Sequence, residues 1–245
     1  MRKIGYRSLQ LTQMARLPRF VLPAHPHHIL QTGNNSELIF REEEDFQRYL
    51  AWLKESAKEF KVAVHAYVLM PDHLHLLVTP STSDGLAQTI QRVGRYYVPW
   101  YNAKYKRSGS LFQGRFKTSL IDAAKYFMTC SRYIESNPVR TGLAAEPGNY
   151  QWSSYSHHAG SRPDSLIVDH ALYWALGNTP FQREAAYIEL SGKALSQADM
   201  ASLDAAVLKG WPLGSDQFKA ELQLRAKRQV LPAKRGRPFK VVAPE

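Results

Sequence analysis

The sequence has 245 residues and a formal net charge of +11, and 44% of its residues are hydrophobic and 22% charged. This composition is typical of a soluble globular protein, with room for one good-sized domain and a smaller appendage. The positive charge favours a polyanionic partner, either nucleic acid or an anionic membrane surface. No apolar run approaches the roughly 18 residues that cross a bilayer. The single cysteine, Cys130, excludes intramolecular disulfides and cysteine-rich zinc sites, so we expect the reducing cytoplasm.

Hydrophobic periodicity predicts alternating strands and helices up to residue 136. In chain order, the pattern predicts a strand at 27–35 closed by Gly-Asn-Asn, a helix at 42–60, strands at 62–70 and 73–80 that form a hairpin, a helix at 84–105, a strand at 115–121 and a helix at 122–136. The order β-α-β-β-α-β-α predicts an α+β fold, a ferredoxin-like antiparallel sheet with helices on one face.

The remaining chain differs in character from this first part. Residues 165–225 are predicted to form short helices, and residues 225–240 form a basic tail without an acidic residue. We therefore expect four parts: a disordered extension at 1–13, a catalytic domain at 14–160, a helical C-terminal region at 161–224, and a basic disordered tail at 225–245.

The segment "MPDHLHLLV" (70–78) holds two histidines one residue apart on a predicted strand. Alternate side chains of a strand share a face, so His73 and His75 point the same way. Two neutral imidazoles on a rigid strand can chelate a divalent cation and leave positions open for phosphate oxygens. Two ordinary half-buried strand histidines explain the same pattern, and these two residues alone favour that reading.

A tyrosine and an asparagine stand one helical turn apart in "CSRYIESNPV" (130–139). Tyr133 shares a helical face with apolar neighbours, so it is either a core aromatic or a nucleophile. Asn137 lies four residues later on the same side. It also precedes a proline, and Asn-Pro is a common helix terminator. Neither residue indicates chemistry on its own.

The segment from Gly85 to Ile121 contains no Asp or Glu over 37 residues. Its seven basic residues are Arg92, Arg95, Lys104, Lys106, Arg107, Arg115 and Lys117. Seven aromatic residues are interleaved with them. Basic and aromatic side chains together suit single-stranded nucleic acid, because phosphates need positive charge and unstacked bases need aromatic faces. A solvated charged face over a partly aromatic core is the alternative reading.

Four stretches in this order and spacing resemble the HUH single-tyrosine transposases, and the REP-associated tyrosine transposases above all. They are "MPDHLHLLV", "GSLFQGRFKTSLI", "RYIESNPVRTGL" and "YQWSSY", and the resemblance covers roughly residues 14–160. It implies the HUH nuclease fold, with Mg²⁺ or Mn²⁺ bound by His73, His75 and Asn137. It also implies that Tyr133 attacks a phosphodiester, which gives a 5′-phosphotyrosine link and a free 3′-OH.

The resemblance further implies that the chain cleaves and rejoins single-stranded DNA at palindromic, REP-like hairpins. It implies no nucleotide cofactor, no small-molecule substrate and no membrane. Relatives act as monomers or homodimers, and the additional C-terminal region favours a monomer here. One alternative is a non-catalytic DNA-binding regulator derived from a transposase. A weaker alternative is a metal-dependent hydrolase that uses water in place of Tyr133.

The basic tail contains "KRGRPFK" (234–240), which resembles the core of an AT-hook. In such a hook Arg235, Gly236, Arg237 and Pro238 would lie along a narrow A·T minor groove. A generic disordered polycation explains the same composition. Either would add salt-sensitive affinity for DNA.

Overall fold

The structure is a computed structural model that describes residues 19–226 and 229–230. Its first elements are β1 (His27–Thr32), the 3-10 turn η1 (Asn34–Ser36), α1 (Glu43–Glu59), β2 (Val62–Leu69), β3 (His73–Pro80), α2 (Gly85–Lys104), β4 (Lys117–Leu120) and α3 (Ala123–Glu135). Next come α4 (Asn137–Arg140), the 3-10 turn η2 (Pro147–Asn149), α5 (Tyr155–His158), α6 (Ala171–Trp174), α7 (Pro180–Gly192), α8 (Gln197–Lys209) and α9 (Asp216–Arg225). The strands and helices predicted up to residue 136 are all present, with small shifts at their ends.

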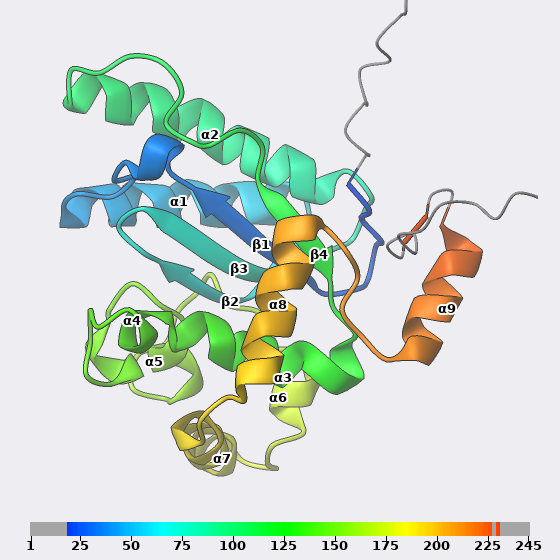
Figure 1. Cartoon of the computed structure of the whole chain (residues 1–245). Helices are drawn as coiled ribbons and strands as arrows, with labels where there is room; N and C mark the ends of the chain where they lie inside the picture. The colour runs from blue at the N-terminus through cyan, green and yellow to red at the C-terminus, as the bar shows by residue number, and fades with distance from the viewer. Residues whose placement is uncertain (1–18, 227–228, 231–245) are drawn as a thin grey trace, which may run out of the picture.

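The four strands form one antiparallel sheet in the order β2-β3-β1-β4 (Figure 1). The predicted hairpin of β2 and β3 is present, and β1 lies between β3 and β4. This strand order and the β-α-β-β-α-β succession make the ferredoxin-like fold that the sequence predicts. Gly33 directly follows β1. A Cβ on this residue would overlap the carbonyl oxygen of Glu37, so the turn after β1 requires glycine.

One face of the sheet is covered by α1 and α2. Leu74, Leu76 and Val78 of β3 point into this layer, together with Ile29 of β1, and all are buried in an apolar core. Aromatic side chains fill the space between the two helices and the sheet. Tyr97 is fully buried there and packs edge-on against Tyr49, with ring centroids 5.2 Å apart. This layer is the helical face that the sequence predicts.

The opposite face carries a second layer, built from α3 and α8, which the periodicity did not place (Figure 1). Ala66, Val68 and Leu77 pack there against Ile134 of α3 and Leu203 of α8. The reason lies in the strands, because nearly every residue of β2 and β3 is buried. A strand that is apolar on both sides needs cover on both sides.

The C-terminal region is helical, as expected. Its last described helix, α9, lies beside the end of β4, where Leu222 packs against Leu120. None of the helices in the described part of the chain has the length and apolar character to span a bilayer. The predicted extension at 1–13 and most of the predicted basic tail, including Arg235, Gly236, Arg237 and Pro238, lie outside the described residues.

Candidate active site on the α3 and α8 face

The two histidines of β3 lie side by side on the face that α3 and α8 cover. His73 is paired with Thr32 of β1, and His75 with Leu30. Leu74, between them, is buried in the apolar layer under α1 and α2. Both imidazoles therefore lie on the opposite face of the sheet. Their ring centroids are 5.3 Å apart and the rings are perpendicular. The strand therefore presents two imidazoles at adjacent positions of one surface.

Each of these imidazoles is held through its Nδ1 atom. Nδ1 of His73 lies 2.6 Å from Oδ1 of Asp72, and Nδ1 of His75 lies 2.8 Å from Nε2 of His28. The Nε2 atoms face the other way. Nε2 of His73 lies 3.2 Å from the side-chain amide of Asn137, and among the described residues nothing bonds Nε2 of His75. Partners on Nδ1 that leave Nε2 available are the usual support of metal-binding histidines.

His28 is a member of this group that the sequence did not indicate. His27 and His28 are the first residues of β1, and both are fully buried. The ring of His28 stacks on that of His75, with centroids 5.0 Å apart. Burial lowers the pKa of His28 to about 3 and that of His75 well below 6.5, so both rings are neutral. Neutral imidazole is the form that binds metals.

Tyr133 projects from α3 onto the same two rings. Its ring stands edge-on to those of His75 and His28, with centroid distances of 5.8 Å to each. Its hydroxyl donates to Oδ1 of Asp204 on α8, and the guanidinium carbon of Arg140 lies 4.1 Å over the ring centroid. Burial, and then the Asp204 carboxylate, raise the pKa of Tyr133 above its usual value of 10. The phenol is therefore neutral near pH 7.

Asn137 reaches the group because α3 ends just before it. The helix closes at Glu135, and Asn137 begins the short α4 with Pro138 behind it. The amide of Asn137 is 5% exposed and meets His73 at the edge of the group. Its oxygen and nitrogen exchange places by a half-turn of the amide, so either atom can face His73. The fold thus gathers all four residues that the resemblance singled out.

In the folded chain, carboxylates of α1 and of the loop before it lie next to basic residues of the acid-free segment 85–121. Arg92 pairs with Glu59. Lys104 lies 2.6 Å from Glu42, 2.9 Å from Glu44 and 2.9 Å from the fully buried Asp45. Arg107 lies 2.6 Å from Glu37. These three predicted DNA-binding residues are thus engaged in ion pairs that hold α2 and the loop after it in place.

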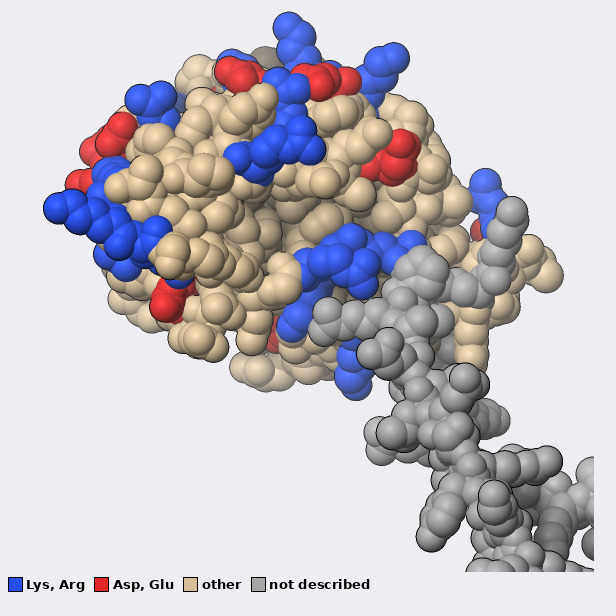
Figure 2. Space-filling model, turned by 90° about the horizontal axis from the view of Figure 1, so that it is seen from above, with Lys and Arg blue, Asp and Glu red and all other residues tan. Residues whose placement is uncertain are grey.

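The other four predicted basic residues have no acidic partner within the described part of the chain. They are Arg95, Lys106, Arg115 and Lys117. Lys117 of β4 is paired with Leu30, which is itself paired with His75, so Lys117 shares the face of the histidines. Arg95 belongs to α2 on the opposite layer. Figure 2, which views the molecule from above, shows Lys and Arg side chains in separate groups rather than in one continuous patch.

A family model described as IS200-like transposases matches residues 22–137. No curated protein sequence is significantly similar to the chain.

Two solved structures match the chain, and the first of them has a similar fold. One is a REP-associated tyrosine transposase bound to a REP hairpin, with a TM-score of 0.53 and 14% identity, over 64% of this chain and 92% of that chain. The other is a candidate transposase from Deinococcus radiodurans R1, with a TM-score of 0.35 and 14% identity, over 52% of this chain and 91% of that chain.

The side chains gathered at this site fit the divalent metal that the resemblance implies. Two imidazoles with Nδ1 engaged can bind a divalent cation through Nε2, and the amide beside them offers the oxygen ligand that Mg²⁺ or Mn²⁺ prefers. The described residues contain no group of three or more His, Cys, Asp or Glu side chains that could hold a metal. A set of two histidines and one amide leaves positions open for oxygens of a phosphate.

Proposed function

We propose that the chain is a DNA transposase that cleaves and rejoins single-stranded DNA at hairpins through a covalent link to Tyr133. The observation that carries the proposal is the convergence of Tyr133 with His73, His75 and Asn137 on one face of the sheet. All four side chains meet within one copy of the chain, so the proposed site needs no second copy. We expect the protein to act on DNA in the cytoplasm.

His73, His75 and Asn137 form the part of the proposed site that binds the scissile phosphate. Mg²⁺ or Mn²⁺ held by His73, His75 and Asn137 would polarise the non-bridging oxygens of the scissile phosphate. Asp72 and His28 fix the orientation of the two imidazoles. Burial keeps His75 neutral, so it does not repel a cation near pH 7.

Tyr133 is the nucleophile, and Asp204 is placed to take up its proton. The phenol oxygen forms a bond to phosphorus while the bond from phosphorus to the 3′-oxygen breaks. The hydroxyl proton passes to the Asp204 carboxylate that already accepts it, and the 3′-oxygen leaves as a hydroxyl after taking a proton from water. A base is needed because the pKa of Tyr133 is raised. Reversal by the 3′-hydroxyl rejoins the strand without a nucleotide cofactor.

Two cations flank this centre and suit the DNA backbone. Arg140 lies over the ring of Tyr133 and donates to its carbonyl oxygen at 2.5 Å, and among the described residues it has no carboxylate partner. Lys117 lies two strands from His75, about 10 Å away at the usual strand spacing. A single strand of DNA that passes from Arg140 over the proposed metal ligands to Lys117 and Arg115 would keep each phosphate near a positive charge.

The test is incubation of the purified chain with Mn²⁺ and labelled single-stranded hairpin DNA. We expect a covalent protein–DNA adduct that EDTA abolishes and that Tyr133→Phe does not form. Tyr126→Phe, on the same helix, is the matched control and is expected to form the adduct. Flanking DNA of the gene, searched for short palindromes, supplies the hairpins.

The same assay separates the alternatives. DNA binding that survives EDTA and Tyr133→Phe, without cleavage of any hairpin, would indicate a non-catalytic DNA-binding regulator. Cleavage that leaves a free 5′-phosphate and tolerates Tyr133→Phe would indicate a hydrolase that uses water. Either result would overturn the proposed mechanism.

A further inference from the structure

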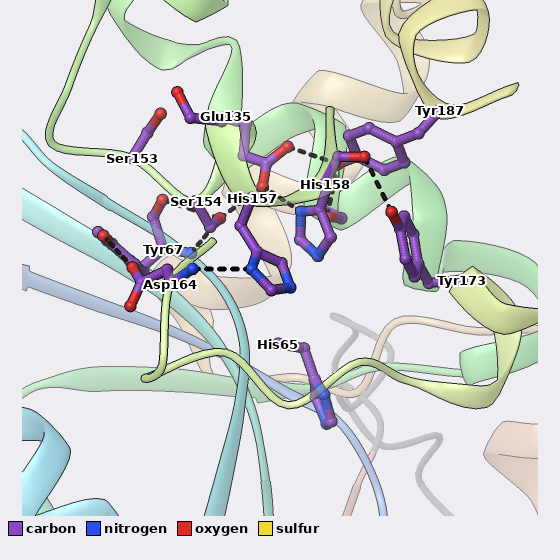
Figure 3. Close-up of polar contacts among 12 residues, drawn as sticks. His65, Tyr67, Glu135, Ser153, Ser154, His157, His158, Asp164, Tyr173 and Tyr187 are labelled. Atoms are coloured by element: carbon purple, nitrogen blue, oxygen red, sulfur yellow. Dashed lines mark hydrogen bonds and ion pairs between the residues drawn. The ribbon is translucent and has the colours of Figure 1, made fainter. Parts of the chain in front are cut away.

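A buried carboxylate stands between Tyr133 and Asn137 on the same stretch of chain. Glu135 is 1% exposed, the last residue of α3, and accepts hydrogen bonds on both oxygens (Figure 3). Its Oε1 lies 2.5 Å from Oγ of Ser154 and 2.7 Å from Nδ1 of His158. Its Oε2 accepts from the hydroxyl of Tyr187 at 2.5 Å. A carboxylate so far from water is stable only while these partners stay in place.

The partners of Glu135 come from separate parts of the chain. Ser154 precedes α5, His158 ends α5, and Tyr187 lies in the middle of α7. Tyr187 reaches α3 a second time, because its hydroxyl lies 2.9 Å from Oγ of Ser131. All of these partners except Ser131 follow residue 137, where the match to the transposase family ends. The contacts therefore connect the catalytic helix to a part of the chain outside that match.

Ser154 belongs to "YQWSSY" (150–155), a motif that the proposed chemistry leaves without a role. The motif is fixed to the end of β2. The amide of Tyr67 donates to Oγ of Ser154 at 2.9 Å, and the amide of Leu69 donates to the carbonyl of Trp152 at 2.9 Å. The ring of Trp152 stacks on Phe46 of α1 at 4.6 Å. Ser154 thus joins Glu135 to β2. This strand is the neighbour of β3, which carries the proposed metal ligands His73 and His75.

The same contacts exclude a second catalytic centre at this cluster. Ser154 and His158 both bond Glu135 and not each other, so no serine is paired with a histidine base. Glu135, Ser154, His158 and Tyr187 are all buried, so the group meets no substrate. The arrangement fixes positions: Glu135 is two residues from Tyr133 and two from Asn137, and it is attached to β2, α5 and α7 at once.

We propose that the segment 150–187 is a brace for the catalytic helix, with Glu135 as the positioning residue that sets Tyr133 and Asn137 against the histidines of β3. The inference rests on the proposed function, because it assigns the brace to that same site. Displacement of a reacting group by about 1 Å can reduce a rate roughly a hundredfold. Loss of one contact of Glu135 is therefore expected to slow cleavage while DNA binding persists.

The test is Tyr187→Phe, which keeps the ring and removes the hydroxyl that contacts Glu135 and Ser131. Adduct formation is measured at saturating hairpin DNA and well below the unfolding temperature. Mn²⁺ affinity is measured by electron paramagnetic resonance in a Tyr133→Phe background. We expect the rate to fall about tenfold or more and Mn²⁺ affinity to weaken about tenfold, with the Kd for DNA unchanged. Ser154→Ala, which adds no volume, is expected to behave likewise, and it serves if Tyr187→Phe does not fold.

Tyr173→Phe is the matched control. Tyr173 is also buried, its ring lies 5.7 Å from that of Tyr187, and its hydroxyl donates to the backbone oxygen of His158 and not to Glu135. We expect it to lower the unfolding temperature but to leave rate and Mn²⁺ affinity unchanged. Wild-type rate and Mn²⁺ affinity in folded Tyr187→Phe and Ser154→Ala would overturn the brace. An absence of adduct in the wild type would instead overturn the proposed function, and the Mn²⁺ measurement would still decide the brace.

Discussion

The two faces of the sheet differ in what they bury. Against α1 and α2 the sheet packs apolar and aromatic side chains, such as Leu76 and Tyr97. Both sides bury ionisable groups, but Asp45 of α1 is paired with Lys104, whereas against α3 and α8 such groups gather near the proposed site, where His28, His75 and Glu135 are each at most 4% exposed. Burying such groups costs free energy unless each has a partner. The first face therefore stabilises the fold, and the second carries the proposed chemistry.

The alternation of β3 explains how one strand serves both faces. Leu74 and Leu76 enter the apolar layer, while His73 and His75 between and beside them enter the polar one. A site on a strand whose other side is packed in a rigid core keeps its geometry more precisely than a site on a loop. Substitutions at neighbouring positions should therefore have separable effects on activity and on stability.

The largest effect is expected from His75→Ala on the polar face. The change removes one proposed metal ligand and leaves the buried ring of His28 without its partner. Partners of metal ligands already contribute 10- to 100-fold, so adduct formation should fall by well over about 100-fold. Single-turnover assays over a range of Mn²⁺ concentrations measure it. A rate within about tenfold of the wild type at saturating Mn²⁺ would remove His75 from the ligand set.

Leu76→Ala, one residue further along, should give the converse result. Leu76 is 1% exposed in the apolar layer. Truncation of a buried leucine costs about 2–5 kcal/mol in the free energy of unfolding. Urea unfolding measures this loss, and the adduct assay under folding conditions should give a rate close to that of the wild type. A strong loss of rate in the folded variant would show that the two faces are not separable.

Asp204→Asn tests the contribution of α8 to the polar face. The amide keeps the size of the side chain and removes the base proposed for Tyr133. Positioned general bases contribute about 10²–10⁴-fold, so we expect the rate to fall by about 100-fold near pH 7. The loss should shrink as the pH rises and hydroxide replaces the carboxylate. A rate equal to or above that of the wild type would mean that Asp204 restrains Tyr133 instead of activating it.

The smallest effect concerns acid stability, which the polar face should lower. Burial lowers the pKa of His65 to about 4, whereas an unfolded histidine titrates near 6.5. Between these values the unfolded chain binds a proton that the folded chain does not. This group therefore contributes stability above pH 6.5 that is lost as the pH falls towards 4, by up to about 1.4 kcal/mol per pH unit. Urea unfolding from pH 7 to 4.5 should show a shallower loss in His65→Gln, and parallel curves would contradict the assignment.

Local pattern was enough to predict the strands, the first helices and the ferredoxin-like order. Periodicity reports which side of an element is buried, and β3 and α3 are strongly periodic. It predicted the helix that became α3 but not the second helical layer, because α8 begins 77 residues after the last strand of the sheet ends. Long-range packing of that kind leaves no local signal.

The site shows the same division between local and distant information. Same-face placement of His73 and His75 followed from alternation, and the resemblance added Tyr133 and Asn137. The contact of His28 with His75 depends on the register between β1 and β3, and Asp204 depends on where α8 docks. Neither can be read from spacing. The ion pairs of the acid-free segment depend on the same distant information, since the partners of Arg92, Lys104 and Arg107 lie in or near α1. DNA binding by these three residues stays a prediction.

The most direct test of the account is the mass of the DNA-linked peptide after trypsin and nuclease digestion of the Mn²⁺-dependent adduct. Cleavage after Arg132 and Arg140 releases the peptide Tyr133–Arg140, whose only tyrosine is Tyr133. We expect this peptide to carry a nucleotide through its 5′-phosphate. A nucleotide on any other tyrosine, or cleaved DNA without a linked peptide, would contradict the assignment of Tyr133 as the nucleophile.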